Sequence, residues 1–518
     1  MGAGPTNSRD VVSRRDAVKL TGLAIGGLVA GAAPQHARAS PTPSGDPRRQ
    51  YSYMETLPDF DPSTPLAANE MRISFMGSCI PPVRRAQQMM SVFVEVGWVT
   101  DPANPSRGRP RDQFIFDCGS GVCANYGAMG VGYGRMDKVF INHLHGDHMS
   151  DLTHIYCFGP SADRKSPLYV WGPGPSGVPA PRYTGGPSEW GLMRNPAMAA
   201  RMYDDGVKAY CRNLREAMRW HTESFSFQST SYKSYVPPTR QTWGLPVDPV
   251  PVGDDPRNDA YAMVPIELNW TRYGRTAGDN VAYANAATGA RVTHFPVIHC
   301  RKGSIGYKLE WNGLSMIYTS DTKPEQHSVR QAVNGGKGVD VFIHEMVPPA
   351  EVWAYKNMGL DAPGDPNDPM WVATLQAITD VQNSSHTPQG AFGYLMSQIR
   401  PRPKLTVATH FPVADDTVES ALQSVRNHVP DVRMGTDLIW SFDLMVLRVF
   451  PDRVEQVKAN VNDYGFSPPA QGIHLDSNVP KYHTPTGSWD AYAQIDTSAA
   501  IPAVDPDTHV LNYRVDGY

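Results

Sequence analysis

Residues 143–148, with the sequence HLHGDH, limit the fold of this chain more than any other segment. They directly follow residues 139–141, a short apolar run that predicts a β-strand. Side chains two residues apart in an extended segment share a side, and the glycine lets the backbone bend toward a second point nearby. Imidazole and carboxylate groups bind zinc, iron and manganese, and they are costly to bury unpaired. The segment therefore predicts a metal site at the end of a strand.

The composition indicates a large folded protein. Of the 518 residues, 41% are hydrophobic and 19% are charged, which allows a sizeable core and excludes a disordered or coiled-coil chain. The formal net charge of −4 lacks the positive excess of a nucleic-acid-binding protein, so we expect no nucleic-acid partner. Six cysteines are too few for a disulfide-dependent scaffold of this length, and their pairing is left open.

Residues 1–39 have the three parts of an export signal. Arg14 and Arg15 precede an apolar run at residues 20–33, and Ala37-Arg38-Ala39 offers small residues for cleavage. The apolar run is too short to span a bilayer, so we expect no stable membrane anchor. The pattern resembles a twin-arginine signal, which implies the export machinery as a partner and a periplasmic or secreted location.

The rest of the chain divides into three stretches. Residues 40–69 predict a linker or arm, residues 70–450 a catalytic domain, and residues 451–518 a C-terminal extension. Within the domain, residues 173–290 form a long insertion with an apolar helical face, which either packs on the core or belongs to a lid over a substrate cleft. Strands are predicted at residues 71–76, 91–96, 113–116, 139–141, 306–310, 315–318, 339–343, 405–408 and 443–450, and helices at 368–382 and 418–429. These elements predict an α/β domain with sandwiched layers.

Four other motifs accompany the histidine segment. They are MRISFMGS at residues 71–78, FDCG at 116–119, TSDT at 319–322 and ATH at 408–410. Together they resemble the metallo-β-lactamase superfamily along most of residues 71–450, which implies an αββα sandwich. His299 ahead of a Gly-Tyr strand, IHE at 343–345 and SHT at 385–387 resemble its tRNase Z and arylsulfatase-like branch. Residues 151–171 resemble metallo-hydrolases named from guanitoxin biosynthesis.

The resemblance implies ligands for two divalent metal ions. The first ion would be bound by His143, His145 and His299, and the second by Asp147, His148 and His410, with Asp321 bridging the two. We expect zinc, with manganese or iron as alternatives. His294 is the alternative to His299, because a proline turn separates them and either could point inward.

Three further residues are expected to support this site. Asp117 would hold a ligand histidine by a hydrogen bond or brace the loop backbone. His386, tuned by Glu345, would donate a proton to the leaving group, and a histidine that only caps a helix is the alternative. We expect His154 to have a supporting or structural role.

The expected chemistry is hydrolysis. Two divalent ions about 3.5–4 Å apart can hold a hydroxide, because metal binding lowers the pKa of water to about 7. Asp147 would help to orient that nucleophile. We therefore predict an exported metal-dependent hydrolase of a small-molecule substrate resembling a phosphate or sulfate ester. The alternatives are a lactone or amide hydrolase, an iron-dependent oxidoreductase of the same fold and a non-catalytic binding protein. Transfer RNA is not expected as the substrate, and the oligomeric state is left open.

Overall fold

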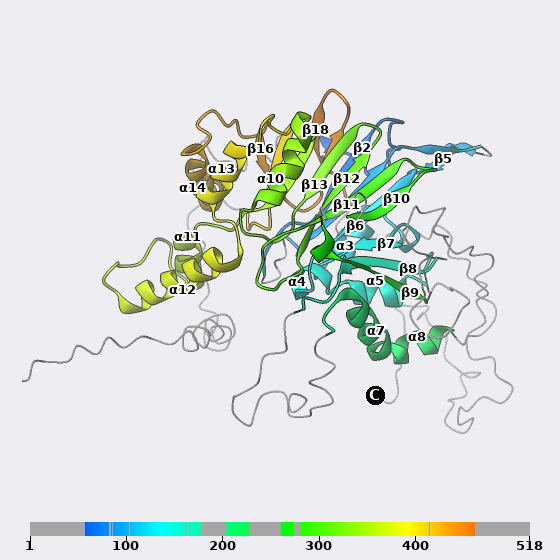
Figure 1. The fold of residues 1–518 in the computed structure, drawn as a ribbon, viewed down its shortest axis with the longest axis horizontal. Coiled ribbons are helices and arrows are strands. Elements are labelled where there is room, and N and C mark those ends of the chain that lie inside the picture. The colour runs from blue at the N-terminus through cyan, green and yellow to red at the C-terminus, as the bar shows by residue number, and fades with distance from the viewer. Residues whose placement is uncertain are drawn as a thin grey trace, which may run out of the picture.

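The structure is a computed structural model that describes residues 57–177, 204–226, 261–273 and 280–461, apart from residues 82, 83, 85, 103, 161, 165 and 414. The export signal predicted at residues 1–39, much of the insertion and most of the C-terminal extension lie outside the described residues. Two large sheets face each other and carry helices on their outer faces (Figure 1). The predicted αββα sandwich is therefore confirmed.

The first sheet has nine strands in the order β1, β18, β17, β2, β3, β6, β7, β8 and β9. Their bounds are β1 (Asp59–Phe60), β2 (Met71–Gly77), β3 (Ser91–Val96), β6 (Asp112–Phe116), β7 (Lys138–Phe140), β8 (Leu168–Pro173), β9 (Met263–Leu268), β17 (Met445–Val449) and β18 (Val454–Ala459). Strands β6 to β9 pair in parallel. The carboxyl ends of β6 and β7 therefore meet at one edge of the sheet.

The second sheet has seven strands in the order β10 to β16. Their bounds are β10 (Val281–Asn285), β11 (Ala290–Pro296), β12 (Ile305–Trp311), β13 (Leu314–Tyr318), β14 (Val341–Glu345), β15 (Leu405–Thr409) and β16 (Leu438–Trp440). Strands β13 to β16 are parallel, so their carboxyl ends also share one edge. A separate hairpin is formed by β4 (Val99–Asp101) and β5 (Asn104–Arg109).

The main core lies between the two sheets. Alternate residues of each strand point inward, as in β2, where Met71, Ile73 and Phe75 are all fully buried. Aromatic rings cross the interface between the sheets, and the rings of Phe116 and Tyr307 have centroids 5.6 Å apart. Full burial of such a side chain contributes roughly 1.5–3 kcal/mol, so the two layers form one cooperative core.

Helices cover the outer faces (Figure 1). Against the first sheet pack α3 (Val122–Ala128), α5 (Leu152–Phe158) and α7 (Val207–Ala217), and α8 (Arg219–Ser226) follows α7. Against the second pack α10 (Gln326–Val333), α13 (Gln389–Gln398) and α14 (Asp415–Arg426). A hairpin of α11 (Ala350–Asn357) and α12 (Pro369–Ser385) stands off to one side with a small core of its own. Short 3-10 helices lie at Tyr133–Arg135, Trp270–Arg272 and Asn334–Gly336.

The structure contains strands that the sequence did not predict, including the interior strand β8 as well as several edge strands. β9 and β10 lie in the insertion, where no strand was expected, and β18 lies in the predicted C-terminal extension. β9 contains Pro265, which argues against a strand in sequence patterns but is tolerated at a sheet edge. All residues of β18 are half-buried, so this strand lacks an apolar alternation. The sandwich therefore continues to Ala459.

The described residues contain no disulfide. All six cysteines are free thiols, and Cys300 is the exposed one among them. No helix in the described ranges is both long and apolar enough to cross a lipid bilayer.

Candidate metal centre

The predicted ligands all follow strand ends. β7 ends just before His143, and the short helix α4 (Gly146–Met149) begins immediately after His145. Asp321 follows β13 and His410 follows β15 in the second sheet, and His299 follows β11. Both sheets therefore contribute side chains to one place at their shared edge.

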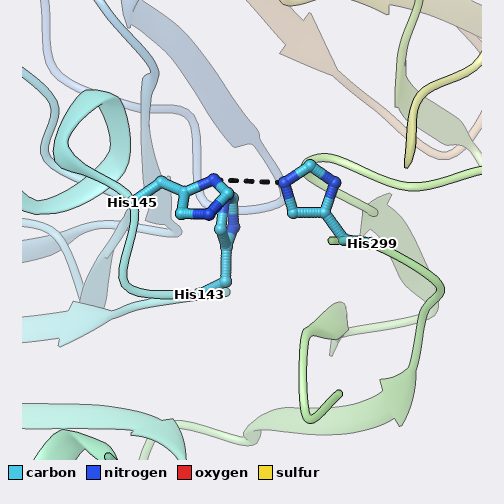
Figure 2. Close-up of side chains that lie close together, drawn as sticks. All are labelled: His143, His145 and His299. Atoms are coloured by element: carbon cyan, nitrogen blue, oxygen red, sulfur yellow. Dashed lines mark hydrogen bonds between the residues drawn. The ribbon is translucent and has the colours of Figure 1, made fainter. Parts of the chain in front are cut away.

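The first group consists of His143, His145 and His299. One ring nitrogen from each lies within 4.8 Å of those of the other two. Figure 2 shows His145 and His299 facing each other, with His143 beside His145, and His145 Nδ1 lies 3.2 Å from His299 Nε2. Three imidazole nitrogens at this spacing match a tetrahedral metal site that keeps one position open.

The second group consists of Asp147, His148, Asp321 and His410, whose ligand atoms also lie within 4.8 Å of one another. His410 Nε2 lies 3.3 Å from Asp147 Oδ2 and 3.4 Å from Asp321 Oδ2. Asp321 Oδ2 lies 3.8 Å from His299 Nε2, so this carboxylate faces both groups. The structure thus brings together all seven residues of the predicted ligand set.

The donor atoms of the two groups fit divalent cations. Among the described residues, His143 Nε2, His148 Nε2 and Asp321 Oδ1 are buried and have no hydrogen-bond partner. His148 Nε2 and Asp321 Oδ1 lie 3.3 Å apart without hydrogen-bond geometry. Buried polar atoms are rarely left unpaired, and these are nitrogen and oxygen ligands that zinc, iron and manganese use. The residues present therefore suit two divalent metal ions.

Electrostatic coupling between the ligands is strong. Burial lowers the pKa of His143 well below its ordinary value, and the neighbouring charge of His148 lowers it further. Burial alone would also lower the pKa of His410, but the carboxylate of Asp321 and a hydrogen bond to Asp147 raise it to about 10. The carboxylates are thus balanced by imidazolium protons, which metal binding would displace.

Asp117 organises the second group from behind. It follows β6, is fully buried, and accepts hydrogen bonds from the backbone N–H of Asn142 at 2.9 Å and the Tyr318 hydroxyl at 2.9 Å. Its Oδ2 lies 2.8 Å from His148 Nδ1 and also accepts from Ser320 Oγ at 2.9 Å. A bond at Nδ1 leaves Nε2 of His148 directed toward the second group.

Three residues of the centre have left-handed backbone conformations. Asp117, Ser320 and His410 have φ values of 57°, 55° and 57°, and each follows a strand closely. Non-glycine residues adopt this region at a cost of order 1–3 kcal/mol, and such strain concentrates at functional sites. At each of these residues, the left-handed conformation bends the backbone at the strand end and directs the side chain toward the metal centre.

Glu345 and His386 form a pair beside the ligands. Glu345 is the last residue of β14, and His386 caps the C-terminus of α12. His386 Nδ1 lies 2.8 Å from Glu345 Oε2 and 4.0 Å from Asp321 Oδ2. Burial lowers the pKa of His386, but the adjacent charge of Glu345 outweighs it and the pKa is raised overall. The Thr322 backbone N–H donates to the other oxygen of Glu345.

His299 is oriented by the same helix end. Its Nδ1 donates to the Ser385 carbonyl at 2.9 Å, which leaves Nε2 free to face His145. The hydrogen bonds that Tyr318 and Ser320 donate to Asp117, and that the Ser385 carbonyl accepts from His299, were not predicted, because the residues they join are distant in the sequence. Ser320 lies inside the TSDT motif and Ser385 inside the SHT motif, and these motifs were the available signals.

Two histidines named from the sequence lie apart from the centre. His294 is buried within β11, and neither ring nitrogen has a hydrogen-bond partner. His154 lies on α5, where its Nε2 is 2.7 Å from the Tyr133 hydroxyl. Neither belongs to a metal-type group among the described residues.

Comparison with known proteins gives partial matches. A stretch of 65 residues is 35% identical to ribonuclease Z from Treponema denticola, covering 12% of this chain and 21% of that protein. A stretch of 143 residues is 26% identical to ribonuclease BN from Salmonella gallinarum, covering 27% and 43%. The chain therefore spans less than half the length of these curated relatives. No protein-family model matches it.

Solved structures that resemble the chain at low sequence identity include a bacterial and a human protein. The metallo-β-lactamase fold protein YhfI from Bacillus subtilis has 11% identity and a TM-score of 0.38, covering 74% of this chain and 100% of that one. The short form of human tRNase Z has 16% identity and a TM-score of 0.32, covering 73% and 99%.

The two-layer topology and the paired metal-type groups are those expected for a metallo-β-lactamase fold. The chain is similar over part of its length to ribonucleases of the metallo-β-lactamase superfamily. The predicted resemblance to this superfamily and to its tRNase Z branch is confirmed. These curated relatives are hydrolases, which is the predicted enzyme class.

The prediction that nucleic acid is excluded as a partner is wrong. The curated relatives are ribonucleases, whose substrate is RNA. The prediction was based on the net charge of −4, which is a sum over the whole chain and does not describe the local charge at one site. Phosphate groups respond to the local field of a site, and two divalent cations would dominate that field.

Proposed function

We propose that this protein is a dinuclear metal-dependent hydrolase that cleaves phosphate-ester bonds, phosphodiesters first among them. The observation that carries the proposal is the convergence of two metal-type groups around Asp321, with the Glu345–His386 pair at their edge. The ribonuclease relatives support phosphodiesters as the bond class. RNA is a candidate substrate on the same ground.

The residues divide the work of such a reaction. Two bound divalent cations would supply Lewis acidity and a nucleophile at neutral pH. His143, His145 and His299 would hold one cation and Asp147, His148 and His410 the other. Asp321 faces both groups and would fix their separation, because its Oδ2 lies within 4.0 Å of ring nitrogens in each.

His386 is placed to protonate the leaving oxygen. Its Nδ1 bonds to Glu345, so the proton it could transfer is on Nε2. The raised pKa of His386 favours the protonated form of the ring, and its side chain is 16% exposed at the edge of the centre. A general acid of this kind contributes roughly 10²–10⁴-fold to the rate when the leaving group is a poor one.

A leaving-group series tests this assignment. We expect His386→Ala to lower kcat for a diester with an alkoxide leaving group by about 10²–10⁴-fold. The loss with bis(p-nitrophenyl) phosphate should be much smaller, because nitrophenolate leaves without a proton. Metal content should stay at the wild-type level, and His154→Ala should behave as wild type. Equal losses with both substrates would show that His386 is not the acid.

A substrate panel tests the bond class. Purified protein of measured metal content is offered an RNA oligonucleotide, bis(p-nitrophenyl) phosphate, p-nitrophenyl phosphate, p-nitrophenyl sulfate and a lactone. We expect turnover of phosphodiesters, abolished by Asp147→Ala. Turnover of the lactone alone, or a single redox-active iron per chain, would contradict the proposal.

We further propose that the protein is exported folded. The support is the ordered succession of paired arginines, apolar run and small-residue site within residues 1–39. Exchange of Arg14 and Arg15 for lysine should keep the protein in the cytoplasm, as cell fractionation would show. Unchanged fractionation would contradict export by this route.

A further inference from the structure

Asp443 is a partly buried carboxylate that belongs to neither metal-type group. It lies in the turn between β16 and β17 and accepts three hydrogen bonds. The donors are Ser78 Oγ at 2.7 Å, the Gln88 backbone N–H at 2.7 Å and Asn125 Nδ2 at 2.8 Å. Burial raises the pKa of Asp443 to about 7, and these hydrogen bonds offset only part of the rise. Serving three donors requires both oxygens as acceptors, which an amide cannot provide.

The segment that Asp443 holds, residues 87–90, contacts the loop of Asp147. The Met90 backbone N–H donates to the Asp147 carbonyl at 3.1 Å, and the Met90 carbonyl accepts from Gly119 at 2.9 Å. A Cβ added at Gly119 would lie 2.0 Å from the Asp147 carbonyl oxygen. Gly119, which bonds to Met90, is therefore packed against the Asp147 loop as closely as backbones allow.

The same segment contacts the loop of His410. Gln87 Nε2 donates to the Phe411 carbonyl at 3.1 Å, and Gln87 Oε1 accepts from the Val413 backbone N–H at 2.8 Å. Phe411 directly follows His410. Residues 87–90 thus join the two loops that supply the second metal-type group.

Ser78 adds a second connection between Asp443 and the His410 loop. Its carbonyl accepts from the Phe411 backbone N–H at 3.1 Å. Its hydroxyl accepts from Gln87 Nε2 at 2.9 Å while donating to Asp443. Two of the three donors to Asp443, Ser78 and Gln88, therefore belong to stretches that bond to the loops of the second group.

We propose that Asp443 is a positioning residue for the second metal ion, because it fixes residues 87–90 and hence the separation of the Asp147 loop from the His410 loop. The inference rests on the proposed function. The loop at residues 143–148 also carries His143 and His145 of the first group, but the bond from Met90 is made at Asp147, a member of the second group. His299 enters the first group from β11, and the bonds described here do not reach that strand. Loss of Asp443 should therefore weaken the second metal ion selectively.

Metal binding tests the proposal without an activity assay. Asp443→Asn and wild type are titrated with Co(II), followed by absorption, and with Zn(II), followed by calorimetry. We expect the second ion to bind roughly 10–100-fold more weakly in the variant and the first ion to bind as in wild type. Asp443→Asn binding both ions with wild-type affinity would overturn the proposal.

Asp340→Asn is the matched control. Asp340 is buried at the opposite ends of β13 and β14, where it accepts from the Ser315 backbone N–H at 2.7 Å and pairs with Lys404 at 2.7 Å. The Asp340→Asn variant should unfold at a lower denaturant concentration and bind both metal ions as wild type does. If this variant also lost the second ion, the loss in Asp443→Asn would reflect general destabilisation of the fold, and the proposal would fail.

If Asp443→Asn does not fold, the Ser78→Ala variant tests whether Asp443 positions the second metal ion. This variant removes one of the three bonds to Asp443, and it should weaken the second ion alone, by less than Asp443→Asn would. Equal weakening of both ions, or of neither, would overturn the proposal. Wild-type protein that binds no metal would instead refute the proposed function, so the two failures are distinguishable.

Discussion

His294 and His299 are close in the sequence but have opposite surroundings. His299 donates to the Ser385 carbonyl and faces the first metal-type group. His294 is 1% exposed, and neither of its ring nitrogens forms a hydrogen bond. Burial lowers the pKa of His294 to about 4, and the polar backbone at Asn269 and Asn280 offsets only part of this effect. His294 is therefore a neutral core residue.

This environment predicts a pH dependence of stability. The unfolded chain protonates His294 below a pKa of about 6.5, whereas the folded protein does so only near 4, so stability falls as pH drops through this window. At pH 5 the loss attributable to His294 is about 2 kcal/mol. His294→Leu should therefore lose about 2 kcal/mol less than wild type between pH 7.5 and pH 5, in urea unfolding of both proteins. Parallel losses would contradict a buried neutral ring.

At the scale of elements, β6 has a carboxylate at each end. Asp112 begins the strand and accepts from the Tyr283 hydroxyl at 2.6 Å, tying the two sheets together far from the metal centre. Asp117 follows the strand and holds His148. One strand therefore offers two buried carboxylates with different tasks.

We expect the two asparagine variants to separate these tasks. Asp117→Asn loses a charged partner of His148 and should lower metal affinity about 10–100-fold. Asp112→Asn should lower the free energy of unfolding by about 1–3 kcal/mol, as a buried hydrogen-bonding group does, and leave metal affinity unchanged. Metal titrations and denaturant melts of both variants make the comparison. Wild-type metal binding by Asp117→Asn would contradict the role assigned to Asp117.

Sequence patterns predicted most of the central strands. The stretch predicted at residues 91–96 coincides with β3, and residues 405–408 lie within β15, because apolar residues occupy alternate positions in both strands. The Asp368 cap and Pro369 marked the start of α12, whose cap accepts from the Met370 backbone N–H. Edge strands such as β18 lack this signal, since solvent covers part of each residue.

The centre was predictable only in part. Spacing alone placed the side chains of residues 143–148 together, whereas Asp321 and His410 were reached through a resemblance to known motifs. The left-handed kink at His410 was not visible, because nothing in its residue type requires it. The bond from Ser78 to Asp443 joins residues 365 positions apart, a separation that no local pattern encodes.

At the scale of the whole molecule, the candidate metal ligands come from both layers. The loop at residues 143–148 leaves the first sheet, whereas His299, Asp321 and His410 leave the second. Bound cations would therefore cross-link the two layers at one edge, in addition to the apolar core between them.

Removal of metal should lower thermal stability. A ligand present at about 1,000 times its Kd stabilises the folded state by about 4 kcal/mol per site. We expect chelator to lower the Tm of wild type by several degrees, measured by calorimetry, and added zinc to restore it. Asp321→Ala, which lacks the shared carboxylate, should respond much less. An equal Tm with and without metal would contradict the cross-link.

The pairing of β1 with β18 has a topological consequence. These strands run in parallel, with Asp59 opposite Lys458 and Phe60 opposite Ala459, so the first and last strands of the sandwich are neighbours. Four strands, β17, β2, β3 and β6, separate this pair from β7, which leads into the histidine loop. The two ends of the described sandwich, near Asp59 and Ala459, therefore lie close together. A short peptide joining its two ends would allow circular permutants to be opened elsewhere, with the metal centre left intact.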